Sequence, residues 1–440
     1  MNTFSQRLLT LIFVASLCLL SVTNLQPVRA DNLSGKLVVD VESWMIDKYN
    51  MKELAARFMK DHPNVEVEVI THEGLGASYQ NIFLEWAQTK ASTADLYFGG
   101  LISQLSPVII DNALLPWDEI MTGDLAPDKW IKGFLSYSEV PGAKDGEKYL
   151  TLPGLGETIN FQYNTKLFES AGLKAPTSYD ELYTAACKLA AMKVNDKSLL
   201  GFEGEYNLNF APDTWMAAVT AEEGTYLTAD GKPNWDSAAG KRWIEFQKKI
   251  VDNKCGGTSV LTDNNGARNA LKAGQAAIIN ASNSRLSEGS VALCAEKDTF
   301  PCKSGETIQA FDYFGGKGTL AFSHQIYIPR VAKNINAARA FAKEQLLSSY
   351  AQTWSAMHYG KMPTIWANYD ALPKNVNFDH VRNELKGDTQ GQWVYRDGQL
   401  LRQLYVDNLQ SYLSGKITLD EMISKLKDGT DKADLTVPKG

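Results

Sequence analysis

The chain has 440 residues, of which 44% are hydrophobic, 22% charged and 10% aromatic, with 33 Gly and 15 Pro. This ordinary composition excludes a largely disordered, collagen-like or coiled-coil chain and leaves room for about two or three domains. The formal charge of −7, with no cluster of Lys or Arg, argues against a nucleic-acid-binding protein, because such a protein needs a concentrated positive face.

The first thirty residues have the layout of a secretory signal peptide. An apolar run from Leu8 to Leu20 follows a basic start, and small residues precede a cleavage site at Asp31. The run is shorter than the roughly 20 residues needed to span a membrane as a helix. Leu17 stands where a lipoprotein site would have Gly or Ala before Cys18. The sequence therefore predicts that residues 1–30 are a cleaved signal peptide and that the protein is released into the periplasm.

The next part of the chain alternates strand and helix patterns. Short β-type runs occur at Leu37–Val41, Val65–Val69 and Leu96–Phe98. Between them, apolar residues recur at helical spacing over Met51–Phe58 and Tyr79–Trp86. Strands that alternate with helices in this way favour right-handed crossovers and a largely parallel sheet.

The middle of the chain again contains strand and helix patterns, but with different spacing. Two short β-like pieces, Tyr149–Pro153 and Thr158–Tyr163, are joined by a glycine-containing segment, and another strand is expected at Ala276–Asn280. Helices are expected to begin after Ser178 and Ser237, which are suitable N-caps. The last 120 residues or so are expected to be mostly helical. Because no linker is evident, the domains are expected to be interleaved.

Four cysteines follow the signal peptide, and in an oxidising compartment they are disulfide candidates. They are Cys187, Cys255, Cys294 and Cys302. Three pairings are possible from sequence alone. Cys294 and Cys302 are the nearest pair, and no CxxC motif suggests a zinc or redox site.

Motifs of common enzyme classes are absent from the sequence. The five histidines form no HExxH pair, and there is no GxSxG nucleophile motif. Gly315–Thr319 lacks the spacing of a phosphate-binding loop. The sequence thus predicts a binding protein with no cofactor and no metal ligand.

Three stretches together resemble the extracellular solute-binding proteins that deliver carbohydrates to ABC importers, the group that includes maltodextrin-binding proteins. The first runs from Phe161 (FQYNTKLFESAGL) to Leu182, with Tyr179 where Trp is usual. The second is Ala270–Ile278 (ALKAGQAAI), and the third is the helical stretch up to Leu347 with the later GKMPT at Gly360. Their order and spacing match the family over essentially the whole mature chain.

The resemblance implies an α/β protein with a two-lobed periplasmic-binding-protein type II fold, interleaved domains and a hinge. Lobe I would comprise residues 31–152 and 318–364, and lobe II residues 153–317 and 365–440 with the C-terminal helices. The crossings between them would lie near Leu152–Thr158, Phe311–Gln325 and Pro363–Asn368. Closure of the lobes on a ligand excludes water and strengthens its hydrogen bonds.

Ligand-binding residues are expected in loops at the carboxyl ends of strands, facing the cleft. Carboxylates and amides suit the hydroxyls of a sugar, and aromatic rings suit its C–H faces. Glu157 matches a carboxylate position of the maltodextrin group, and Trp215 resembles a position near that group's aromatic wall. The predicted ligand-binding residues are Glu42, Ser43, Trp44, His72, Glu73, Gly99, Glu157, Trp215, Asn280, Ser282, Gly318, His324 and Trp366. Trp86 and Trp243 lie on apolar helical faces and are expected in the core.

The function implied is that of the binding component of an ABC importer, a monomer that captures a sugar, an oligosaccharide or a glycosylated polyol and passes it to the membrane permease. Two alternatives remain at this stage. One is a receptor for a cationic solute such as a polyamine or betaine in the same fold, since aromatic faces attract cations. The other is a secreted hydrolase with an unrecognised motif.

Overall fold

The computed structural model describes residues 33–74, 76–138, 148–194, 196–208, 210–256, 265–296 and 300–437. The predicted signal peptide, residues 1–30, lies outside the described residues. Among the helices described, none has the length and apolar character that crossing a membrane would require.

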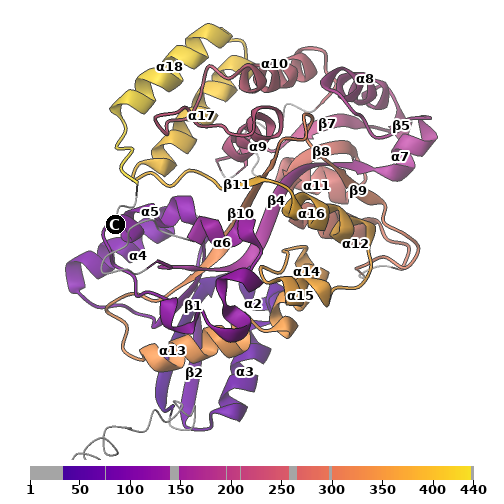
Figure 1. The fold of residues 1–440 in the computed structure, drawn as a ribbon. Helices are drawn as coiled ribbons and strands as arrows, with labels where there is room; N and C mark the ends of the chain where they lie inside the picture. Colours follow the sequence, from indigo (N-terminus) through magenta and orange to yellow (C-terminus); the bar gives the residue numbers. More distant parts are fainter. Residues whose placement is uncertain are drawn as a thin grey trace, which may run out of the picture.

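Nine strands of the described chain form one twisted mixed sheet that runs through the molecule (Figure 1). Seven of them follow in the order β2 (Val65–His72), β1 (Gly35–Glu42), β3 (Leu96–Leu101), β10 (Thr319–Tyr327), β4 (Leu152–Asn164), β8 (Ala276–Ser282) and β7 (Leu200–Gly204). Two short strands pair beside this path, β9 (Ile308–Phe311) with β4 and β11 (Thr389–Gln390) with β10. A separate hairpin joins β5 (Lys193–Val194) to β6 (Lys197–Ser198).

The helices group into two lobes around the ends of this sheet, as Figure 1 shows. Around β1, β2 and β3 lie α2 (Met45–Lys48), α3 (Met51–Asp61), α4 (Gly76–Thr89), α5 (Ile102–Ile110), α6 (Lys132–Ser138) and α13 (Ile335–Phe341). Around β7, β8 and β9 lie α7 (Thr165–Ser170), α8 (Tyr179–Ala190), α9 (Ala211–Glu223), α10 (Ala238–Asp252), α11 (Gly266–Lys272), α12 (Ser284–Leu293), α16 (Val376–Lys386), α17 (Gly398–Leu413) and α18 (Leu419–Lys432). Between the two groups lie α14 (Ser349–Tyr359) and α15 (Trp366–Asp370). We call the first group lobe I and the second lobe II.

The remaining helical turns are short. In the described part of lobe I, 3₁₀ turns occur at Asp118–Ile120, Gly123–Leu125 and Pro127–Lys129. A π-helical turn, Ala342–Leu346, continues α13.

Strands β4 and β10 belong to both lobes. The first part of β4 pairs with β10, from Leu152 to Thr158, whereas its later residues pair with β8. Strand β10 also pairs with β3 in lobe I, and its register shifts at His324. The first two predicted crossings, Leu152–Thr158 and Phe311–Gln325, overlap with these two strands, and their positions stay a prediction. The exact residue boundaries of the lobes stay a prediction.

The strand directions modify the sequence expectation. Strand β1 is parallel to both β2 and β3, as the alternating pattern predicts. At the centre, however, β10 is antiparallel to both β3 and β4, and β4 is antiparallel to β8. The sheet is therefore mixed rather than largely parallel, because the chain crosses between lobes through its central strands.

The two β-like pieces predicted on either side of Gly154 are one continuous strand, β4. The glycines do not make a turn. A Cβ at Gly154 would lie 2.4 Å from the ring of Phe98, and one at Gly156 would lie 2.3 Å from the ring of Phe134. The glycines are required because aromatic side chains of lobe I pack directly on this strand.

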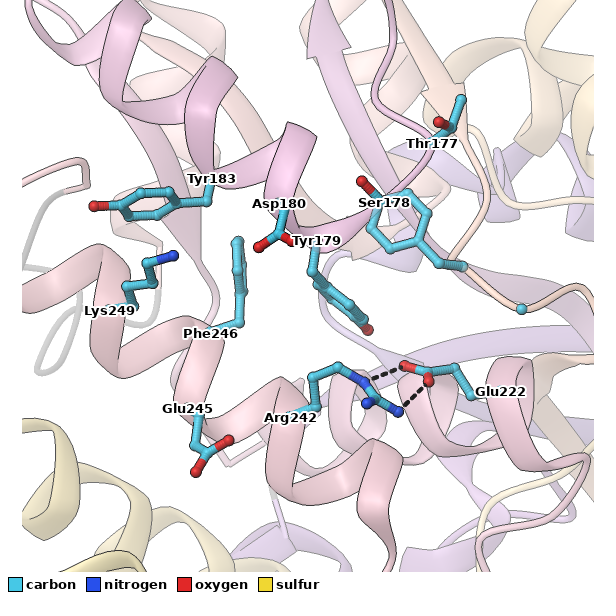
Figure 2. A pocket seen from close by; sticks show the side chains of 12 residues that line it. Thr177, Ser178, Tyr179, Asp180, Tyr183, Glu222, Arg242, Glu245, Phe246 and Lys249 are labelled. Carbon is cyan, nitrogen blue, oxygen red and sulfur yellow. Dashed lines mark hydrogen bonds and ion pairs between the residues drawn. The ribbon is translucent and has the colours of Figure 1, made fainter.

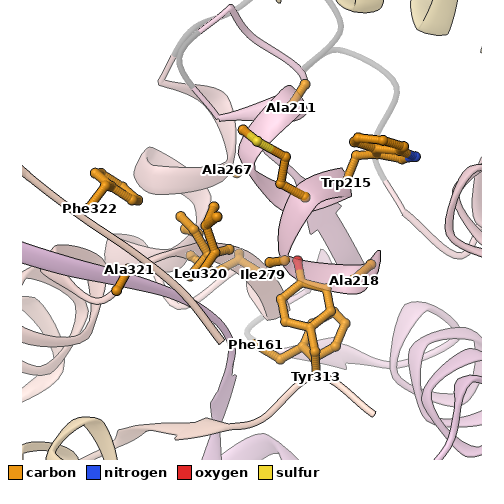
Figure 3. Packing of buried hydrophobic residues seen from close by; sticks show 14 of the residues in the cluster. Phe161, Ala211, Trp215, Ala218, Ala267, Ile279, Tyr313, Leu320, Ala321 and Phe322 are labelled. Atoms are coloured by element: carbon orange, nitrogen blue, oxygen red, sulfur yellow. The ribbon is translucent and has the colours of Figure 1, made fainter. Parts of the chain in front are cut away.

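The helix and core predictions agree well with the structure. The predicted apolar face of α3, from Met51 to Phe58, is buried, and the side chain of Ser178 caps α8. Trp86 and Trp243 are buried as expected. Figure 3 shows part of the core in which Phe161 packs beside Tyr313.

The four cysteines form two disulfides within lobe II. Cys187 of α8 is joined to Cys255, with the Cα atoms 4.4 Å apart, and Cys294 is joined to Cys302, with the Cα atoms 5.8 Å apart. One of the three possible pairings is thereby selected.

Candidate functional site

A cavity of about 430 Å³ lies where the two lobes meet. Its walls come from the ends of β1 and β2 in lobe I, from loops and helices of lobe II, and from the shared strands β4 and β10. The lining residues are Glu42, Ser43, Trp44, Glu73, Gly74, Leu101, Gln104, Glu157, Asn207, Phe210, Asn265, Arg268, Arg285, Phe322, His324, Tyr359 and Lys361. Its volume is in the range expected for a small-molecule site.

Six of the predicted ligand-binding residues meet in this cavity. Glu42, Ser43 and Trp44 reach it from the end of β1, and Glu73 follows β2. Glu157 and His324 reach it from β4 and β10. In sheets built from right-handed crossovers, the carboxyl ends of parallel strands lie at the same edge of the sheet. The cavity lies at this edge, as the sequence predicted.

His72 and Gly99 lie behind the cavity wall rather than in it. His72 Nδ1 is 2.7 Å from Asp40 Oδ1, so this imidazole is engaged within the sheet. A Cβ at Gly99 would lie 2.7 Å from Cγ of Glu42, and the φ angle of Gly99 is 147°. Gly99 therefore leaves space for Glu42, because a side chain at this position would collide with the Glu42 side chain.

Five predicted residues lie elsewhere. Trp215 is fully buried on α9 (Figure 3). Its ring packs against that of Trp235, with the ring centroids 4.5 Å apart. Asn280 and Ser282 are buried within β8. Gly318 lines a separate hollow beside α16, and Trp366 packs on Tyr369 in α15. Helical packing turns the side chain of Trp215 into the core, a direction that sequence spacing alone did not determine.

The carboxylate of Glu42 is buried at the end of β1. It accepts hydrogen bonds from the Tyr79 hydroxyl, the Trp44 indole N–H and the backbone N–H of Gly100, the last at 2.6 Å. Burial alone raises the pKa of Glu42, but His324, Tyr79 and Gly100 outweigh it and lower this pKa to about 2. Glu42 is thus an ionised acceptor that orients the Trp44 ring.

A cluster of three charged side chains, Glu157, His324 and Lys361, connects β4, β10 and the segment after α14. Lys361 Nζ donates to Glu157 Oε1, and His324 Nε2 lies 3.1 Å from the same oxygen. Burial raises the pKa of Glu157, but Lys361 and His324 outweigh it and hold that pKa well below its usual range. Burial and Lys361 lower the pKa of His324, yet Glu157 and Glu42 outweigh them and raise it.

Some lining residues were missed by the sequence reasoning. Arg285 on α12 is buried, its Nε lies 3.2 Å from Glu205 Oε1, and its guanidinium lies 5.3 Å from the ring centroid of Phe210. Tyr359 lies 5.0 Å from Trp44, ring to ring. Lys361 lies inside the GKMPT motif, and Arg285 lies three residues after Ser282, which was predicted to bind ligand. These positions in the sequence were usable signals for both residues.

The lowered pKa of Glu42 predicts acid sensitivity of the folded state. Because this pKa falls from 4.5 to about 2 on folding, its contribution is present above pH 4.5 and is lost as the pH falls toward 2. The free energy of unfolding should drop by on the order of 3 kcal/mol across this interval from Glu42 alone. In guanidinium titrations at pH 6 and pH 3, Glu42→Gln should show a smaller drop than the wild type. The exposed control Glu53→Gln should behave as the wild type, and an equal drop in all three proteins would contradict the assignment.

A second hollow, of about 420 Å³, lies within lobe II beside the start of α8 and the middle of α10. Figure 2 shows Tyr179, Tyr183 and Phe246 in its wall, with Arg242 paired to Glu222 across 2.6 Å. None of the predicted ligand-binding residues lies there, and all its walls come from one lobe. The cavity between the lobes is therefore the candidate functional site.

The comparison of the sequence with protein families gives one broad match. The model of the family described as bacterial extracellular solute-binding protein matches residues 43–350, which is more than half of the chain. Among curated proteins, a probable amino-acid ABC transporter periplasmic-binding protein of Sinorhizobium fredii is 26% identical over 172 residues. That match spans only 38% of this chain and 38% of the relative.

Solved structures match over nearly the whole chain. The GacH receptor of Streptomyces glaucescens, solved unliganded and in complex with acarbose, has a TM-score of 0.74 and 20% identity, covering 91% of this chain and 98% of that one. The maltose-bound MalE3 of T. maritima has a TM-score of 0.73 and 16% identity, covering 90% of this chain and 100% of that one. These matches show the two-lobed fold.

Proposed function

Because the chain belongs to the bacterial extracellular solute-binding proteins, we propose that it captures a neutral sugar or short oligosaccharide between its lobes and presents it to the permease of an ABC importer. The ligand occupies the cavity bordered by Trp44, Glu157 and Tyr359. The proteins of known structure described above, which bind acarbose and maltose, support this ligand class.

The observation that carries the proposal is the combination of an acceptor and an aromatic wall. Glu157 is ionised and lines the cavity, and its Oε2 accepts no hydrogen bond from the described residues. A sugar hydroxyl is a suitable donor for such an oxygen, which is costly to leave unsatisfied. The paired rings of Trp44 and Tyr359 offer an apolar surface for the C–H face of a pyranose.

A cationic ligand fits this cavity poorly. The lining carboxylates of Glu42 and Glu157 are already matched by His324 and Lys361. A cation already lies beside both aromatic rings, since Lys361 Nζ is 5.3 Å from the ring centroid of Trp44 and 5.5 Å from that of Tyr359. A further cation would be repelled by this ammonium group, whereas a neutral polyol is not.

A thermal-shift panel tests the proposal. It contains neutral saccharides such as maltose and acarbose, sugar alcohols, amino acids, putrescine and glycine betaine. At one hundred times its Kd, a ligand stabilises the folded state by about 2.7 kcal/mol, so a binding saccharide should raise Tm clearly. The shift should be the same at low and high salt, because a neutral ligand is not screened. A shift caused only by amino acids or by the cations would contradict the proposal.

The proposal includes the cellular setting. Residues Leu8–Leu20 act as the apolar core of an export signal, and the mature protein works as a monomer in the periplasm without catalysing a reaction. After prolonged incubation with the protein, a bound saccharide should be recovered chemically unchanged.

A further inference from the structure

Three metal-ligating side chains converge outside the proposed sugar cavity, on the segment that leads into the shared strand β10. Asp312 follows β9, and His380 and Glu384 lie one turn apart on α16. One ligand atom from each lies within 4.8 Å of the others. They border a hollow of about 480 Å³ that is also lined by Asn383 and Asp388.

The distances suit a bound ion. His380 Nε2 lies 3.1 Å from Asp312 Oδ1 and 3.7 Å from Glu384 Oε1. Two ligands that each lie 2.0–2.2 Å from a tetrahedral ion are about 3.4 Å apart, which falls between these two separations. A spacing of four residues on a helix brings the His380 and Glu384 side chains to the same face.

The imidazole of His380 also has an unsatisfied nitrogen atom. His380 Nε2 is buried, yet it makes no hydrogen bond within the described residues, even with the Asp312 oxygen 3.1 Å away. A hydrogen bond requires the acceptor to lie along the N–H direction. When an imidazole binds a metal ion, the ion itself lies along the lone pair of the nitrogen, and the other ligand atoms are arranged around the ion. His380 Nε2 is therefore a buried nitrogen without a hydrogen bond, 3.1 Å from one carboxylate oxygen and 3.7 Å from the other, and an ion shared with these oxygens would satisfy it.

Hydrogen bonds fix the orientation of the Glu384 carboxylate, as is usual for carboxylates that bind metal ions. Its Oε2 accepts hydrogen bonds from Thr158 Oγ1 at 2.7 Å and from Asn160 Nδ2 at 3.3 Å. These bonds leave Oε1 facing His380. Such supporting hydrogen bonds orient ligands and tune affinity in metal sites.

We propose that Asp312, His380 and Glu384 form a site for a divalent first-row transition ion such as Zn²⁺. An imidazole nitrogen with two carboxylate oxygens suits zinc, whereas calcium and magnesium prefer oxygen ligands alone. Three protein ligands leave a fourth position for water, because the Asp312 side chain is 67% exposed. A bound ion joins α16 to the connection between β9 and β10. The sequence patterns predict no metal site, since no local motif contains all three residues.

Zinc titration of the full mature chain, untagged and treated with a chelator, tests the proposal. Isothermal titration should give one Zn²⁺ per chain, and Co²⁺ should give a visible absorption band that Zn²⁺ displaces. His380→Ala should weaken Zn²⁺ binding at least about tenfold, since even a supporting residue of a metal site is worth that much. The matched control is His358→Ala, which changes an exposed histidine that stacks on Trp354.

Asp312→Asn gives a second test, because this exposed side chain can be changed without disturbing the core. It should also weaken Zn²⁺ binding while circular dichroism stays unchanged. Two results would overturn the proposal. One is the absence of saturable Zn²⁺ binding, which would leave His380 as an imidazolium paired with two carboxylates. The other is Zn²⁺ binding that both variants leave unchanged.

Discussion

Replacing Trp44 with alanine should weaken saccharide binding by about 30- to 150-fold, equivalent to about 2–3 kcal/mol. The substitution removes the ring that stands beside Tyr359 and lines the cavity. It also removes the indole N–H that donates to Glu42, so the buried carboxylate loses one of the hydrogen bonds that it accepts. Both losses act at the surface where the ligand is proposed to bind.

Isothermal titration with the saccharide that gives the largest thermal shift measures this effect. The matched control is Trp354→Ala on α14, which removes a half-buried indole that stacks on His358 outside the cavity. This control should bind the saccharide as the wild type does. Equal affinity of Trp44→Ala and the wild type would show that the ligand does not use this wall.

Replacing Lys361 with methionine should destabilise the protein by about 3–5 kcal/mol, because it leaves the charge of Glu157 buried without its main partner. Lys361 and Glu157 are both almost completely buried, and His324 is a second basic side chain beside the carboxylate. Methionine keeps the volume of the side chain, so the loss reports on charge rather than on packing.

The double variant Lys361→Met/Glu157→Gln should recover a large part of this loss, because no uncompensated charge remains. Chemical unfolding of the two single variants and the double variant gives the coupling free energy between the residues. Lys52→Met, a change of an exposed lysine on α3, should stay within about 0.5 kcal/mol of the wild type. If Lys361→Met were as stable as the wild type, the buried ion pair would have no structural role.

Local patterns were sufficient for much of the fold. The alternation of strands and helices in the first part of lobe I, the apolar face of α3 and the cap at Ser178 all follow from the order of neighbouring residues. The positions after β1 were also predictable, since the ends of parallel strands meet at one edge of a sheet. This is why Glu42 and Trp44 were correctly placed at the cavity.

Other features depended on residues far apart in the chain. The predicted break at Gly154 was wrong, because the glycine accommodates the ring of Phe98 from another strand. Trp215 was assigned to the site from a local resemblance, but the packing of α9 against Trp235 buries it.

Motifs within short stretches of the sequence identified the family, and the family implied the two-lobed fold. Local patterns also identified the strand ends whose side chains line the cavity. Only the tertiary structure decided the electrostatics of the cavity. The partners Glu157 and Lys361 are 204 residues apart, and Asp312 meets His380 from a different element. Charge compensation and metal coordination act over a few ångströms in space, and the spacing of residues along the chain does not fix those distances.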